Sequence, residues 1–157
     1  MLRLMTCIGV LLLSGSALAA PPEIKGEQAL TKDSQEVCRY DSTSRGVLDE
    51  KAFALCLVNQ RRWIDQVIRM GRENQQDYYT KASYPFCYGR STRRGTTNPG
   101  LMYMCLRSEI ESYKDVMYYL DKLGQERVIP IIRAELAEYG SWLMVKTRIK
   151  NELDPPP

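Results

Sequence analysis

The sequence has 157 residues, of which 44% are hydrophobic, and a formal net charge of +3. This length and composition predict one folded domain and exclude wholesale disorder. The sequence contains no histidine, which excludes Ser-His-Asp and Cys-His catalysis, histidine metal sites and pH sensing through imidazole. So small a net charge gives no indication of nucleic-acid binding.

The first 19 residues have the pattern of a cleavable signal peptide. Arg3 precedes the apolar run Ile8–Leu13, and Ala17-Leu18-Ala19 fits the small-x-small cleavage rule. The apolar run is too short to cross a membrane. We therefore expect cleavage after Ala19 and an exported protein, periplasmic or secreted, with no membrane span.

The residues at the two ends of the mature chain carry no helix signal. Residues 20–37 are polar and uncapped, so we expect a flexible N-terminal arm there. Residues 154–157 read Asp-Pro-Pro-Pro and cannot continue a helix, which predicts a Pro-rich tail. A single helical domain is expected between them, over residues 38–153.

Four cysteines remain after cleavage, Cys38, Cys56, Cys87 and Cys105, and their spacing reveals an internal repeat. Residues 38–57 aligned on residues 87–106 are identical at seven of twenty positions, where chance gives about one. The shared pattern is C-x3-S-T-x-R-G-x9-C-L. An even number of cysteines in an exported chain predicts two disulfides. A zinc site is the rival interpretation, but the CxxC spacing of metal knuckles is missing.

Each repeat predicts a polar turn followed by a capped helix. Ser, Thr and Gly favour the turn, and Asp49 in one copy and Asn98 in the other are strong N-cap residues, with Pro99 suited to the first helical position. A bridge within each unit, Cys38–Cys56 and Cys87–Cys105, would hold the turn against the helix and stabilise the fold by roughly 3 kcal/mol. Crossed pairing between the units is the alternative.

Three main helices are predicted from apolar spacing and no strand, so the fold class is all-α, a small disulfide-stapled bundle. The first runs from about Glu50 into the seventies, with a stripe that includes Trp63. The second runs from Pro99 to near Gly124, and the third from about Gln125 to Leu153 with Trp142 in the core. In the linker between the units, Pro85 is expected to end any helix before Cys87.

Arginines and tyrosines are the candidate partner-binding residues. Arg90, Arg93 and Arg94 form a basic cluster on the second turn, and Arg45 is the counterpart of Arg94 on the first. A guanidinium suits carboxylates and phosphates, although Arg45 and Arg94 can equally brace their own turns. Tyrosine is common at protein interfaces. The tyrosines that fit no apolar stripe, and so suggest an adhesive surface, are Tyr78, Tyr79, Tyr88 and Tyr119.

Cys87 and Cys105 enclose a loop that leads into a helix carrying Tyr113 and Leu120, and Gln60-Arg61-Arg62-Trp63 lies on the preceding helix. This pattern resembles the exported helical domains of LprI-type lysozyme inhibitors. The cysteine spacing is wider here, and a mildly positive chain gains no electrostatic steering toward a basic lysozyme. The resemblance implies inhibition of a cell-wall hydrolase, and it transfers no contact residues.

The sequence therefore predicts a non-enzymatic binding module for a protein partner in the cell envelope or outside the cell. The most concrete form of this hypothesis is an inhibitor of a cell-wall hydrolase such as lysozyme. The alternative is a structural or accessory component of an envelope, secretion or conjugation apparatus. A carboxylate enzyme is the third hypothesis, but Asp65, Glu109, Glu111 and Asp115 are interpreted as a solvated helix face. We expect no cofactor and no metal.

Overall fold

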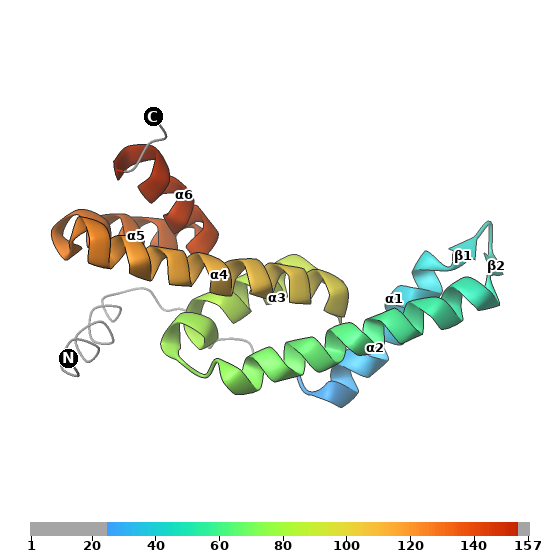
Figure 1. Cartoon of the computed structure of the whole chain (residues 1–157). Coiled ribbons are helices and arrows are strands. Elements are labelled where there is room, and N and C mark those ends of the chain that lie inside the picture. Colours follow the sequence, from blue (N-terminus) through green and yellow to red (C-terminus); the bar gives the residue numbers. More distant parts are fainter. Residues whose placement is uncertain (1–24, 154–157) are drawn as a thin grey trace.

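A computed structural model describes residues 25–153 of the chain. The expected signal peptide, residues 20–24 and the expected tail at residues 154–157 lie outside this part. Within it, helices dominate and the only strands are two short hairpins (Figure 1). The all-α, disulfide-linked fold class is confirmed.

The elements follow one another in a repeating order. The first unit consists of α1 (Glu27–Asp41), β1 (Thr43–Ser44), β2 (Val47–Leu48) and α2 (Glu50–Glu73). The second consists of the π-helix η1 (Tyr78–Ser83), α3 (Tyr84–Ser91), β3 (Thr92–Arg93), β4 (Thr96–Thr97) and α4 (Pro99–Leu123). The third consists of α5 (Gln125–Tyr139) and α6 (Trp142–Leu153).

The duplication extends well beyond the twenty aligned positions. A shift of 49 residues places α2 on residues 99–122, and α4 spans Pro99–Leu123. The same shift places α1 on residues 76–90, which η1 and α3 largely occupy. The repeated unit is therefore a complete helix–hairpin–helix module.

Both hairpins have the same two-residue turn. The strand register leaves Arg45 and Gly46 as the turn of β1–β2, and Arg94 and Gly95 as the turn of β3–β4. All four residues have positive φ, from 51° to 86°, which is the geometry of a type I′ turn. Glycine adopts this conformation freely, whereas arginine does so at a cost of about 1 kcal/mol.

The predicted caps and bridges are present. The Asp49 Oδ1 atom accepts hydrogen bonds from the second and third backbone N–H groups beyond it at the start of α2, and Asn98 Oδ1 does the same for α4. The disulfides are Cys38–Cys56 and Cys87–Cys105, each within one unit. The crossed pairing is wrong.

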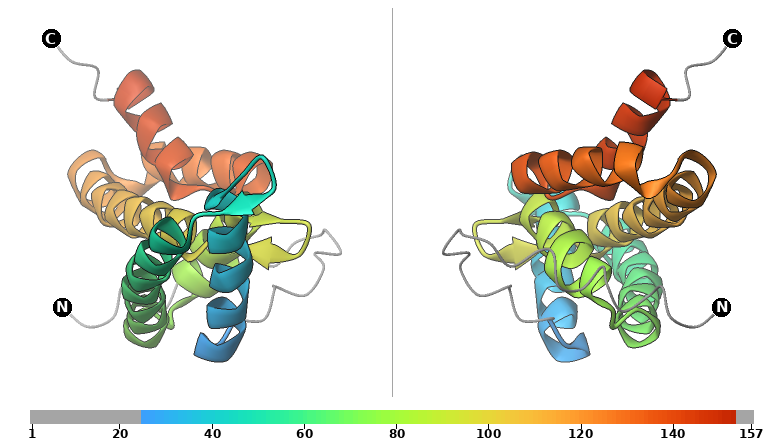
Figure 2. Two further views of the ribbon diagram at one scale, coloured as in Figure 1. Left: turned by 90° about the vertical axis from the view of Figure 1, so that its right-hand side faces the viewer. Right: turned by 90° about the vertical axis from the view of Figure 1, so that its left-hand side faces the viewer.

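The three units stack in a staggered row (Figures 1 and 2). α4 packs on α2, and α6 packs on α4 on the side away from α2. One polar contact recurs at both steps. Gln60 in the middle of α2 approaches the N-cap residue Asn98 of α4, and Glu109 in the middle of α4 binds Ser141 before α6. Gln60 and Glu109 are equivalent residues under the 49-residue shift.

Two apolar clusters form the core along this row. The first joins α1, α2, η1, α3 and α4, and includes Leu30, Ile64 and Tyr79. The second joins α4, α5 and α6, and includes Val116 and Trp142. The second unit contributes to both clusters, so it is the centre of the fold.

Several expectations are wrong in detail. From Glu27 onward the expected arm is the helix α1, which buries Leu30, Ser34 and Cys38 against the rest of the fold. The expected third helix is interrupted at Gly140, whose φ of 64° ends α5. Pro85 does not end a helix before Cys87, because η1 runs directly into α3 and Pro85 is the second residue of α3.

Candidate functional site

A groove of about 580 Å³ lies between α1, the β3–β4 hairpin and the start of α4. It is the place where three of the four predicted arginines meet. Its lining residues are Glu36, Val37, Tyr40, Asp41, Arg90, Ser91, Arg93, Arg94, Thr96, Asn98 and Leu101.

The groove has fixed walls because α1 is bonded to the second hairpin. Asp33 on α1 accepts a hydrogen bond from the backbone N–H of Thr97 at 3.0 Å, and its Oδ2 atom lies 2.6 Å from the Lys25 Nζ atom. The Lys25 ammonium also donates to the carbonyl oxygen of Gly95 at 3.2 Å. Disulfides anchor both walls further, at Cys38 in α1 and Cys87 in α3. Ligands therefore meet a largely preformed surface.

The basic wall carries arginines that the rest of the described chain does not neutralise. Arg93 and Arg94 are exposed, and within residues 25–153 neither side chain makes a hydrogen bond or an ion pair. Arg94 also holds the left-handed conformation, with φ of 51°. Arg90 is exposed and lies 5.6 Å from the ring centre of Phe86. Arg94 therefore presents its guanidinium from a fixed turn, as Arg45 does in the first hairpin.

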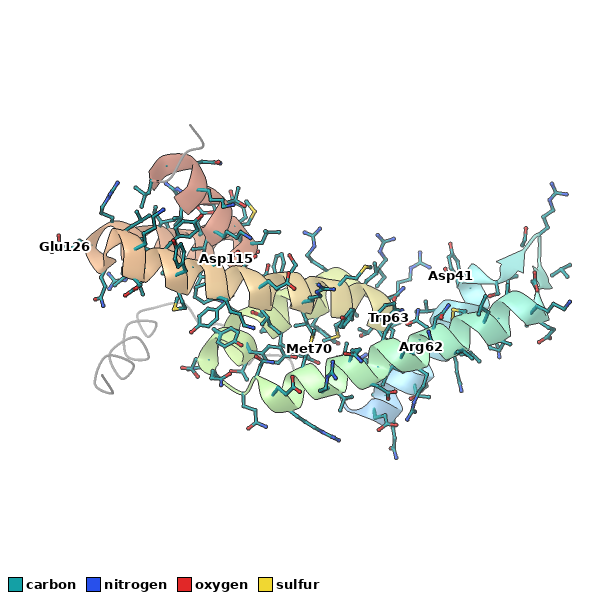
Figure 3. The ribbon with its side chains drawn as sticks, viewed as in Figure 1. Asp41, Arg62, Trp63, Met70, Asp115 and Glu126 are labelled. Carbon is teal, nitrogen blue, oxygen red and sulfur yellow. A yellow bond between two sulfur atoms is a disulfide. The ribbon has the colours of Figure 1, made fainter. Side chains whose placement is uncertain are left out.

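The opposite wall combines apolar and acidic groups. Tyr40 is 84% exposed and Leu101 is 48% exposed, which leaves a tyrosine and a leucine at the surface of the groove. Glu36 and Asp41 add carboxylates from α1, and Figure 3 shows Asp41 on this helix near the first hairpin. The groove thus offers charges of both signs around apolar contact area.

The predicted adhesive tyrosine surface is wrong for Tyr79 and Tyr119. Tyr79 is 0% exposed and Tyr119 is buried, so neither is available to a partner. Tyr78 is half-buried and stacks on Tyr113, with ring centres 3.7 Å apart. Tyr88 is also half-buried and lies beneath the Lys25 ammonium. Tyr78, Tyr79 and Tyr88 pack η1 and α3 onto the core, whereas Tyr119 belongs to the second core cluster.

Arg45 and Trp63 lie outside the groove. Arg45 is exposed at the tip of the first hairpin and does not join the other arginines. Trp63 is 36% exposed, so its assignment to the core is wrong. It points from α2 toward α4 and stacks on Tyr103 beside a shallower hollow of about 440 Å³ (Figure 3).

Glu109 does not belong to a solvated helix face. It is 1% exposed and accepts hydrogen bonds from Ser141 Oγ and the Trp142 backbone N–H, each at 2.7 Å. Burial raises the pKa of the Glu109 carboxyl, while these bonds and the nearby Arg90 oppose the rise. The carboxylate is occupied in holding the start of α6. Asp115, by contrast, pairs with Lys146 at 2.6 Å.

Val37, Tyr40 and Leu101 also line the groove but were not among the predicted binding residues. Val37 fell within the expected arm at residues 20–37, and no local pattern marks Tyr40 or Leu101 as groove residues. The signal that was present is the four-residue spacing of Leu30, Ser34 and Cys38, which places all three on one helix face.

Neither a metal centre nor a membrane span is found among residues 25–153. No group of three or more Cys, Asp or Glu side chains in this part is arranged to hold a metal ion. None of its helices combines the length and the apolar character needed to cross a bilayer. Comparison of the chain with family models, curated proteins and solved structures finds no match.

Proposed function

We propose that this protein is an exported, non-enzymatic module that binds a protein partner in the periplasm or outside the cell through the groove between α1 and the second hairpin. The observation that carries the proposal is the set of unpaired arginines beside exposed Tyr40 and Leu101 on walls fixed by disulfides. Arginine and tyrosine are enriched where proteins bind one another.

The walls supply binding energy at low entropic cost. Because α1 and the hairpin are already bonded to each other, little backbone order is lost when a partner docks. Arginine forks suit surface carboxylates of a partner, and Glu36 and Asp41 suit its basic groups. Export is supported by the signal-like N-terminus and by two disulfides, which persist in oxidising compartments.

Inhibition of a cell-wall hydrolase is the concrete form of this proposal. The hydrolysis of cell walls by lysozyme, measured with increasing amounts of the mature protein, should fall and then level off at a fixed stoichiometry. The test variant is Arg94→Asn together with Tyr40→Ser, which alters the groove and should abolish the inhibition. Undiminished lysozyme activity with the wild-type protein would contradict the hydrolase form.

Arg45→Asn is the matched control. Both Arg45 and Arg94 hold positive φ, at 52° and 51°, and asparagine tolerates this conformation better than arginine. Each single Arg→Asn change should therefore raise the free energy of unfolding by about 0.5–1 kcal/mol. Only the change at Arg94 should weaken partner binding. Equal loss of binding from both changes would place the binding surface elsewhere.

The second candidate function is an accessory component of an envelope, secretion or conjugation apparatus. The observation that favours it is the stacked-unit architecture, since such repeats present extended surfaces to large partners. It predicts stable co-purification with a large complex and no effect on lysozyme turnover.

A further inference from the structure

The end of the stack formed by the first unit is left uncovered. The β1–β2 hairpin and the first turns of α2 extend beyond the start of α4 (Figure 1). Leu48, Phe53 and Leu57 lie on this end and are only half-buried. We call these three residues the open face.

In the second unit, the residues equivalent to the open face are buried. The 49-residue shift maps the open face onto Thr97, Met102 and Leu106, and all three are 0% exposed. They are covered because the first unit lies over them. Met102 and Leu106 share a core cluster with Leu30 of α1 and Ile64 of α2.

No unit precedes the first one within residues 25–153, so its equivalent surface has no such cover. Leu48 stands where the covered unit has a threonine, which makes the uncovered surface more apolar than its buried counterpart. Terminal units of stacked repeats normally present a polar outer face. An apolar end is therefore the mark of a surface that is buried in an assembly.

The segment between the predicted cleavage site and Lys25 is too short to span the distance to this face. The backbone N–H of Lys25 is bonded to the Tyr84 hydroxyl in the second unit, at the opposite end of α1 from the hairpin. α1 has 15 residues and is about 22 Å long, whereas the predicted mature residues 20–24 span at most about 17 Å. The described chain ends at Leu153 in α6, which lies at the far end of the stack (Figure 1).

We infer that the open face is covered by the open face of a second copy of this chain, in a two-fold symmetric dimer. Asp49, Glu50 and Lys51 beside the face are all exposed, and a surface that carries both signs can complement itself about a two-fold axis. A partner whose surface carries charges of one sign would gain no net electrostatic attraction from these mixed charges. All four cysteines in residues 25–153 are bridged within the chain, so the association is non-covalent.

Sedimentation velocity of the mature, oxidised protein over a concentration series tests this inference. The wild-type protein should form a dimer. The double variant Leu48→Thr, Phe53→Gln should weaken dimerisation at least about tenfold. Leu48→Thr alone should weaken it less and should fold normally, because Thr97 occupies the same position in the second hairpin.

The control is Leu143→Thr, which changes an exposed leucine on α6 at the other end of the stack and should leave the dimer unaltered. A wild-type protein that stays monomeric at all concentrations overturns the inference, including the case in which a different protein covers this face. A dimer that resists the double variant, or one that Leu143→Thr dissociates, also overturns it. The groove arginines are unchanged in these variants, so failure here is independent of the proposed partner binding.

Discussion

Two buried tyrosines in one core cluster differ in the hydrogen bonding of their hydroxyl groups. The hydroxyl of Tyr84 accepts a hydrogen bond from the Lys25 backbone N–H at 2.7 Å. The hydroxyl of Tyr79 is buried and has no hydrogen-bond partner among residues 25–153. Burial accordingly raises the pKa of both phenols. A buried polar group without a partner costs free energy that its removal recovers.

Replacement of each tyrosine by phenylalanine should therefore change stability in opposite directions. Tyr79→Phe removes an unsatisfied hydroxyl and keeps the ring, so the free energy of unfolding should rise by up to about 1 kcal/mol. Tyr84→Phe leaves the Lys25 N–H without its acceptor and should lower the free energy of unfolding by about 1 kcal/mol. Urea denaturation of the two variants and the wild type measures both changes, and a loss of stability in Tyr79→Phe would contradict the assignment.

Local residue chemistry was predictable where the backbone alone decides it. Asp49 and Asn98 could be identified as caps because a short acceptor side chain before an apolar period satisfies free N–H groups in any fold. The burial of Tyr79 could not, because its surroundings come from α1, α2 and α4, elements distant in the sequence. Tyr40 illustrates the same limit, since its exposure depends on where α1 ends relative to the second hairpin.

Equivalent side chains contact the helix starts at the two joints of the stack. In the second unit Glu109 holds the start of α6, and in the first unit Gln60 approaches the start of α4. The free N–H groups of a helix start carry partial positive charge, which suits a carboxylate. Desolvation opposes that charge and raises the pKa of the Glu109 carboxyl.

Substitutions at Glu109 should separate the hydrogen bonds from the charge. Glu109→Ala leaves buried donors at the start of α6 without an acceptor and should lower the free energy of unfolding by about 1–3 kcal/mol. Glu109→Gln keeps an oxygen for the Trp142 N–H and an amide for Ser141 Oγ, so it should stay within about 1 kcal/mol of the wild type. Chemical denaturation at neutral pH measures both. Equal losses in the two variants would contradict a role in hydrogen bonding.

The same glutamine variant tests the raised pKa through the pH dependence of stability. Because the folded protein holds the Glu109 proton to higher pH than the unfolded chain does, this residue's contribution to the free energy of unfolding falls as pH rises from the ordinary pKa of 4.5 through the raised value. Glu109→Gln removes that contribution. The difference in stability between wild type and variant should then shift in favour of the variant over this pH range, and a constant difference would refute the raised pKa.

Whole helices were predictable in proportion to the strength of their own signals. α2 and α4 have caps, long apolar periods and clear ends, so their bounds agree closely with expectation. α1 begins at Glu27 after Gly26, which provides no side-chain cap. Its bond from Asp33 to Thr97 joins residues 64 positions apart, and no local pattern reveals such a contact. The break before α6 has a local cause in the left-handed Gly140, whereas the acceptor for the start of α6 is Glu109, a residue of another helix.

The stack gives its three units unequal numbers of neighbours. The second unit lies between the other two, whereas the first has one neighbour and an open face. In such arrays stability is approximately the sum of unit and interface terms. The end unit can therefore open locally while the centre stays folded, and opening of the centre disrupts both clusters.

The two disulfides allow this difference to be measured, because both join residues 18 positions apart. Chain-entropy models assign each roughly 3 kcal/mol, so any difference between them reports position in the stack. Replacing Cys87 and Cys105 by alanine should lower the denaturation midpoint of the whole chain, because Cys87 belongs to the first core cluster. Replacing Cys38 and Cys56 should mainly speed amide hydrogen exchange in β1, β2 and the ends of α1 and α2 beside them. If both double variants instead shift the global midpoint equally, with uniform exchange, the chain unfolds as one cooperative body and the end unit has no independent stability.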